Sequence, residues 1–102
     1  MIVSKNADVE GVAITSVEGL PVEGPATLKP LMSGDNMIML ELTLPAGSGT
    51  ALHTHRHESI CYVVKGTVKF VVEDETYMLS AGDSCRHPEG VPHSVAALED
   101  AT

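Results

Sequence analysis

The chain has 102 residues, the size of one domain, and it is long enough to bury a core without disulfide staples. Fourteen acidic residues against six basic ones give a formal net charge of −8. Because this charge repels phosphate backbones and anionic lipid surfaces, nucleic acid and membranes are not expected partners.

The two cysteines, Cys61 and Cys85, form neither a CxxC motif nor a multi-cysteine framework, which predicts free thiols in a reducing compartment. The first residues contain no apolar run with basic flanks, and no later segment approaches 18 consecutive apolar residues. We therefore expect a cytoplasmic protein.

In chain order, residues 1–12 are the least patterned and are predicted to form a mobile arm or an arm that pairs with another subunit. GLPVEGP (19–25) then reads as a break between elements. Segments rich in Val, Ile, Leu, Tyr and Thr follow and predict strands within 36–44, 59–73, 75–80 and 93–98, with a hairpin tip at 73–75. Short strands at this spacing predict an all-β sandwich or barrel formed by a single domain, 1–102.

The apolar run ICYVV at 60–64 predicts a strand that is covered on both faces. The barrel interior would cover one face, and another sheet or subunit would cover the other. A small chain with only three aromatic residues has little else to bury against this surface, which favours a homodimer.

The segment HTHRHES (53–59) holds three of the five histidines. Along an extended chain, side chains at positions i and i+2 point to the same face, so His53 and His55 can reach one ion together. His57 shares that face only if the strand continues past Arg56. Neutral imidazole is a common metal ligand, but an HxH pair alone is weak evidence.

Two spaced motifs surround these residues. In the first, Gly47 is followed by five residues, His53, one residue, His55, and a closing Gly66. In the second, Gly82 is followed by five residues, Pro88, one residue, Gly90, two residues and His93. Together the motifs resemble the two signature motifs of the cupin superfamily, and residues 67–81 between them resemble the short spacer of small single-domain bacterial cupins.

The resemblance covers residues 47–97 and implies a double-stranded β-helix, a jelly-roll barrel whose mouth holds one divalent metal. It assigns the metal to His53, His55 and His93, a set suited to Zn, Fe, Ni, Mn or Cu. The family's glutamate falls on Ser59, and its asparagine falls on Ala97.

These departures leave open positions for water or substrate. Glu58 is a fourth ligand only if its loop is one residue tighter than usual, and otherwise it points away. Ser59 is expected to hydrogen-bond a metal-bound water.

The remaining reactive side chains have less specific interpretations. His57 and His87 are more consistent with surface or supporting roles than with metal binding. Cys61 is expected to line the cavity as a small filler on the same face as Ser59, and Cys85 to be structural.

The predicted function is a metal-binding cupin, an enzyme of dioxygenase, isomerase or lyase type acting on a small polar metabolite. A non-catalytic cupin that binds a small ligand through the same metal is the alternative. A structural dimer with a vestigial site is a third reading.

Overall fold

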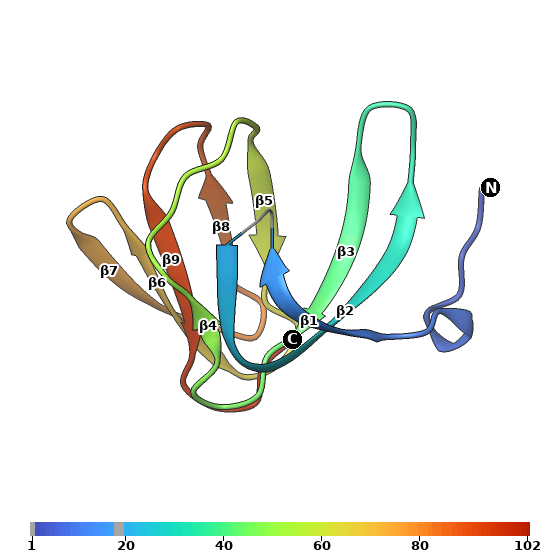
Figure 1. Cartoon of the computed structure of the whole chain (residues 1–102), viewed down its shortest axis with the longest axis horizontal. Helices are drawn as coiled ribbons and strands as arrows, with labels where there is room; N and C mark the ends of the chain where they lie inside the picture. The colour runs from blue at the N-terminus through green and yellow to red at the C-terminus, as the bar shows by residue number, and fades with distance from the viewer. Residues whose placement is uncertain (1, 18–19) are drawn as a thin grey trace.

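The computed structural model describes residues 2–17 and 20–102, and it is built from strands with one short 3-10 helix. Figure 1 shows the hairpin of β2 and β3 projecting away from the body of the molecule, on the same side as the N-terminus. The elements are η1 (Asn6–Asp8), β1 (Val12–Val17), β2 (Leu20–Ser33), β3 (Ile38–Thr43), β4 (Gly49–Thr50), β5 (Ser59–Tyr62), β6 (Thr67–Val72), β7 (Glu75–Ser80), β8 (Ser84–His87) and β9 (His93–Ala97). The predicted all-β class is confirmed.

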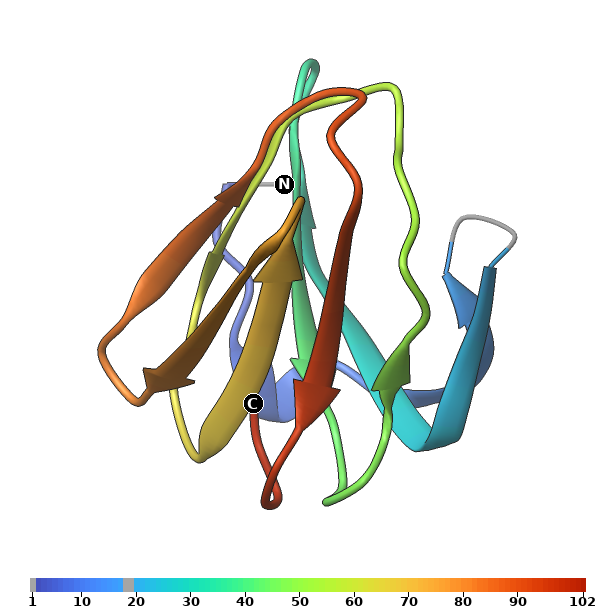
Figure 2. The same cartoon turned by 90° about the vertical axis from the view of Figure 1, so that its left-hand side faces the viewer.

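The strands pair as two sheets. The first follows the order β1-β2-β4-β9-β6-β7, with β3 added alongside β2, and the second consists of β5 and β8. Figure 2 shows β9, β6 and β7 side by side, and these neighbours pair antiparallel. The pairings recorded among the described strands form these two sheets and not one closed barrel.

The core lies between β6, β9 and the C-terminal segment. Strand β6 alternates as expected for a half-buried strand, with Val68 and Phe70 buried and Lys69 exposed. A cluster of Val63, Val68, Ala97 and Ala101 forms the centre, and Leu44, Leu79 and Val95 pack against it. Ala97, at the position of the family's asparagine, is therefore part of the core.

The predicted strand region 59–73 contains two strands. Strand β5 ends at Tyr62 and β6 begins at Thr67. Gly66 between them has a φ of 85°, a left-handed conformation that glycine adopts at little cost, so the chain turns there. The predicted hairpin tip lies between β6 and β7, where Glu73 also has a positive φ of 52°.

Several strands were not predicted. The segment 19–25 was expected to be a break, yet β2 begins at Leu20 and runs through it, while Gly19 lies outside the described residues. A proline cannot donate to a sheet, and the register of β2 against β3 shifts between Pro30 and Met32. Short strands β4 and β8 also lack an apolar run that would reveal them.

The start of the chain is partly tied to the sheet. Within the predicted arm 1–12, Met1 lies outside the described residues and Asn6 begins η1. The Asn6 amide donates to Glu41, and Lys29 donates to Asn6 Oδ1, both at 2.9 Å. No helix among the described residues is long and apolar enough to cross a membrane.

Candidate metal centre

Backbone hydrogen bonds bring the two histidine motifs together at one end of the molecule. His53 and His93 form an isolated antiparallel bridge in which each backbone N–H donates to the other's carbonyl at 2.8 Å. The backbone N–H of Gly90 donates to the carbonyl of His55 at 3.0 Å. Figures 1 and 2 both show the loop after β4 beside the turn between β8 and β9.

The side chains of His53, His55 and His93 converge from this scaffold. One ring nitrogen of each lies within 4.8 Å of the others. The ring centroid of His93 is 4.4 Å from that of His53 and 4.7 Å from that of His55. His93 is buried, with 1% of its surface exposed, while the other two are partly exposed. The group therefore has a protected side and an open side.

The second nitrogen of each ring has a backbone partner. His53 Nδ1 lies 2.8 Å from the carbonyl of Ala51, and His93 Nδ1 lies 3.1 Å from that of Val91. His55 Nδ1 lies 3.1 Å from the carbonyl of His57. Because a carbonyl only accepts, all three Nδ1 atoms carry the proton, and in the neutral rings the lone pairs belong to Nε2.

His93 is held in its neutral form. Burial lowers the pKa of His93 below its ordinary value, and the nearby His87, His53 and His55 lower it further by charge repulsion, against an opposing effect of the Val91 carbonyl. A metal ion needs a neutral imidazole, so the environment of His93 matches that requirement.

This donor set fits a transition metal. Three neutral imidazoles, each with its other N–H given to a carbonyl, have the arrangement that orients histidine ligands in metal sites. His53, His55 and His93 would hold the ion, and three protein ligands would leave coordination positions for water or a substrate.

The two residues at the glutamate position lie apart from this group. Glu58 is exposed and accepts a hydrogen bond from Arg86 at 3.1 Å, as an ion pair across β5 and β8. Ser59 Oγ lies 2.9 Å from Nδ1 of His87. Neither residue contributes to the three-histidine group in the described part of the chain.

The other two histidines stack on the group. The ring of His57 lies parallel to that of His55, with centroids 4.5 Å apart. His87 is 7% exposed, and its ring stacks on His93 at 4.1 Å. The sequence left a surface or a supporting role open for His87, because β8 has no apolar pattern that would predict its burial. Pairing β8 with β5 would have placed His87 opposite Ser59.

The cysteines lie directly opposite one another on β5 and β8, and both thiols are free. Cys61 shares the face of Ser59 and is exposed, with Sγ 4.0 Å from His87 Nδ1. Cys85 Sγ lies 3.6 Å from His87 Nε2. A hydrogen bond from Cys85 lowers the pKa of Cys61 to about 4, and the same bond raises the pKa of Cys85.

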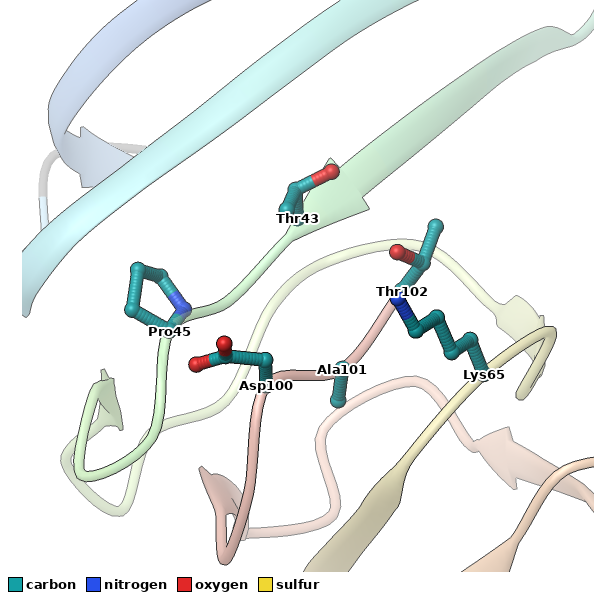
Figure 3. Close-up of a pocket in the computed structure, with 6 residues that line it drawn as sticks. All are labelled: Thr43, Pro45, Lys65, Asp100, Ala101 and Thr102. Carbon is teal, nitrogen blue, oxygen red and sulfur yellow. The ribbon is translucent and has the colours of Figure 1, made fainter.

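A separate hollow of about 270 Å³ lies at the other end of the molecule, beside the C-terminus. Figure 3 shows its lining residues, which are Thr43, Pro45, Lys65, Asp100, Ala101 and Thr102. None of the five histidines contributes to it. Asp100 is already used there, since its Oδ1 accepts from the backbone N–H of Ala46 at 2.9 Å.

Comparison with known proteins relates the whole arrangement to one family. The chain is 28% identical over 79 residues to oxalate decarboxylase OxdC of Bacillus subtilis (strain 168). This match covers 72% of the chain but only 20% of OxdC, so the chain spans about a fifth of the length of that relative.

Solved structures with the same fold cover nearly the entire chain. A predicted oxalate decarboxylase from Thermotoga maritima superimposes with a TM-score of 0.84 at 25% identity, covering 98% of this chain and 92% of the other. KdgF from Halomonas sp. gives a TM-score of 0.81 at 24% identity, covering 97% and 86%. An RmlC-like cupin from Shewanella frigidimarina also gives 0.81, at 22% identity, covering 99% and 84%.

The family model described as "Cupin domain" matches residues 40–102. This range is more than half of the chain and contains both histidine motifs. The chain therefore belongs to the cupin family.

Proposed function

We propose that His53, His55 and His93 bind one divalent transition metal through their Nε2 atoms. The observation that carries this proposal is that all three Nδ1 atoms donate to backbone carbonyls, which leaves the Nε2 lone pairs for the ion. Imidazole ligands suit Zn, Fe, Ni, Mn or Cu. When bound, the metal would supply Lewis-acid or redox chemistry.

We propose that the metal centre acts on a small carboxylate, with oxalate as the first compound to test. The similarity to oxalate decarboxylase OxdC and to the predicted oxalate decarboxylase from Thermotoga maritima supports this class. A divalent ion with three neutral ligands carries a net positive charge, which favours an anion at its open positions despite the protein's net charge of −8.

The chain's own residues suit a decarboxylation. Conversion of oxalate to formate and carbon dioxide consumes one proton, which is delivered to the carbon that loses carbon dioxide. His57 and His87 stack on two of the proposed ligands, and imidazole is the side chain that most often serves as a general acid. His57 is the exposed one of the two, and we assign it the role of proton donor.

A non-catalytic role in ligand binding is the second candidate. The observation that favours it is the exposed ion pair between Glu58 and Arg86. This pair holds Glu58, the carboxylate nearest in sequence to His55, at the surface. In this reading the metal captures a small acid without turning it over.

One experiment separates the two candidates. Protein purified without added metal is analysed for metal content, and then formate release and thermal stabilisation by oxalate are measured. Metal with formate supports the enzyme, and metal with stabilisation but no formate supports the binding module. His53→Ala should remove the metal held by the three histidines, whereas Thr54→Ala, an exposed neighbour, should retain it. A wild-type protein that binds no supplied divalent metal would overturn both candidates.

We also propose that the protein is a homodimer and that its two sheets are the walls of a jelly-roll barrel. Ile60, Tyr62 and Val64 are 73%, 65% and 60% exposed, so this chain leaves one face of the predicted run uncovered. Met37, Ile38 and Met39 near the start of β3 are 79%, 61% and 63% exposed. A second subunit would remove these apolar side chains from water.

A further inference from the structure

We propose that Cys61, Cys85 and His87 form a second metal site, which takes a thiolate-preferring ion such as Zn²⁺ or Cu⁺. One ligating atom of each residue lies within 4.8 Å of the others. The three residues come from β5 and β8, so their placement depends on the pairing of those strands. The site is separate in its ligands from the three-histidine group and does not depend on the function proposed for that group.

The distance between Cys85 and His87 matches tetrahedral coordination of one ion. Bonds of about 2.3 Å to sulfur and about 2.0 to 2.1 Å to nitrogen place neighbouring S and N ligands roughly 3.6 Å apart, and two S ligands roughly 3.8 Å apart. Cys85 Sγ lies 3.6 Å from His87 Nε2. Cys61 Sγ lies 4.0 Å from the other nitrogen of this ring, Nδ1, and within 4.8 Å of the ligating atoms of both other residues.

Ser59 is placed to support the tautomer of His87 that a metal ligand needs. Its Oγ lies 2.9 Å from His87 Nδ1 and can accept the Nδ1 proton. The lone pair is then on Nε2, the nitrogen that faces Cys85. Ser59 would thus support this second site, a role different from the one expected at the glutamate position of the family.

The two thiols lie close enough to coordinate one soft ion. The hydrogen bond from Cys85 lowers the pKa of Cys61 and raises that of Cys85, so the two sulfurs already share one proton. Binding an ion would replace the proton shared with Cys85 by a metal that both sulfurs coordinate. Because Cys61 is exposed, the ion has a path from solvent.

The geometry favours a metal over a disulfide as the purpose of the pair. A cross-strand disulfide would use only the two sulfurs, whereas here His87 supplies a third donor and Ser59 orients it. The parallel rings of His87 and His93, at 4.1 Å, would separate the two ions by a stacked imidazole pair. The second site would therefore adjoin the first at the same end of the molecule.

Cobalt(II) is a probe that distinguishes the two sites. A thiolate bound to Co²⁺ gives an intense near-ultraviolet charge-transfer band, which a three-histidine site lacks. Metal-free protein, reduced with a phosphine, is titrated with Co²⁺ alone. We expect the band, and two equivalents bound in total. The Cys61→Ser, Cys85→Ser double variant should lose the band and one equivalent, and Ser84→Ala, an exposed neighbour on β8, should keep both.

The His53→Ala, His55→Ala double variant tests independence, because it should keep the thiolate band and lose the other equivalent. If the three histidines bind no metal, the wild type should bind one equivalent of Co²⁺ in place of two and should still show the thiolate band. If a serine variant fails to fold, alkylation of the wild-type thiols replaces it, and Zn²⁺ should slow their modification at least tenfold until a chelator is added. Absence of the band in the wild type, its persistence without the cysteines, or alkylation indifferent to Zn²⁺ would overturn the second site.

Discussion

At the scale of single residues, the proposed metal centre depends on the proton that each of His53, His55 and His93 carries on Nδ1. Carbonyls of Ala51, His57 and Val91 accept these protons. Two of the three carbonyls lie two residues before their histidine, and one lies two residues after. The local backbone therefore sets the tautomers, without help from a carboxylate.

The lowered pKa of His93 predicts a pH dependence of stability. Below about 6.5, the ordinary His value, the unfolded chain takes up a proton that folded His93 resists. The contribution of His93 to the unfolding free energy is thus fully present above that pH and is lost as the pH falls toward the lowered folded value. Chelator-treated wild type should lose more stability than His93→Gln between pH 7 and 5 in denaturant titrations. Equal losses would contradict the assignment.

Substitutions of Glu58 and Ser59 should affect metal affinity differently. The Glu58 ion pair is exposed on both sides, and such pairs contribute at most about 1 kcal/mol. We expect Glu58→Gln to leave the affinity of the three-histidine site within about threefold. A loss of a hundredfold or more, measured by competition with a chelator, would make Glu58 a ligand.

Ser59→Ala should act on the other cluster. It removes the hydrogen bond that fixes His87, and losing such support lowers metal affinity by roughly tenfold or more. The loss should appear in the thiolate band and not in the three-histidine equivalent. An equal loss at both sites would place Ser59 between them.

Among the elements, the turn between β5 and β6 holds the C-terminal segment in place. The backbone N–H of Val64 donates to Thr102, and Thr102 N–H donates to Lys65, both at 2.9 Å. Gly66 in this turn has a positive φ, and a Cβ there would lie 2.3 Å from the carbonyl oxygen of Asp100. No side chain larger than hydrogen fits without moving backbone.

Gly66→Ala should therefore destabilise the protein by both strain and collision, together about 2 to 4 kcal/mol. Gly82→Ala is the matched control, because Gly82 has a φ of 95° but no atom within 4 Å of an added Cβ. We expect a loss of only about 1 kcal/mol at Gly82. Denaturant midpoints of the two variants measure the difference, and equal losses would show that the backbone at Asp100 yields.

The predictable elements were those with a strong side-chain pattern. The segment before Glu73 alternates polar and apolar residues from Thr67 to Phe70, and it forms β6. The long strand β2 was missed because its prolines and Gly24 resemble turn residues, although sheet partners on both edges keep it extended.

The same contrast applies to the site. Convergence of His53, His55 and His93 could be predicted from two spaced motifs, while their role as ligands stays a proposal. The proximity of Cys61, Cys85 and His87 could not be predicted from the sequence, because it depends on the register between β5 and β8. Register is a property of strand pairing that neither segment carries alone.

For the whole molecule, the exposed apolar side chains predict a defined oligomeric state. A homodimer should give a mass near 21 kDa by light scattering, twice the 10.7 kDa of the chain. Tyr62→Glu should shift the mass toward the monomer because it buries a charge in the proposed interface. Thr76→Glu, an exposed change on β7, should not. A wild-type mass near that of one chain at micromolar concentration would contradict the dimer.

The bridge between His53 and His93 also bears on the order of folding. It joins positions about 40 residues apart, and a loop of that length carries an entropic closure cost of roughly 3 kcal/mol before any ligand can be shared. An unfolded or partly synthesised chain thus offers at most the neighbouring pair His53 and His55. The complete set exists only after β9 has paired, so a metal should be captured late and should slow unfolding far more than it speeds folding.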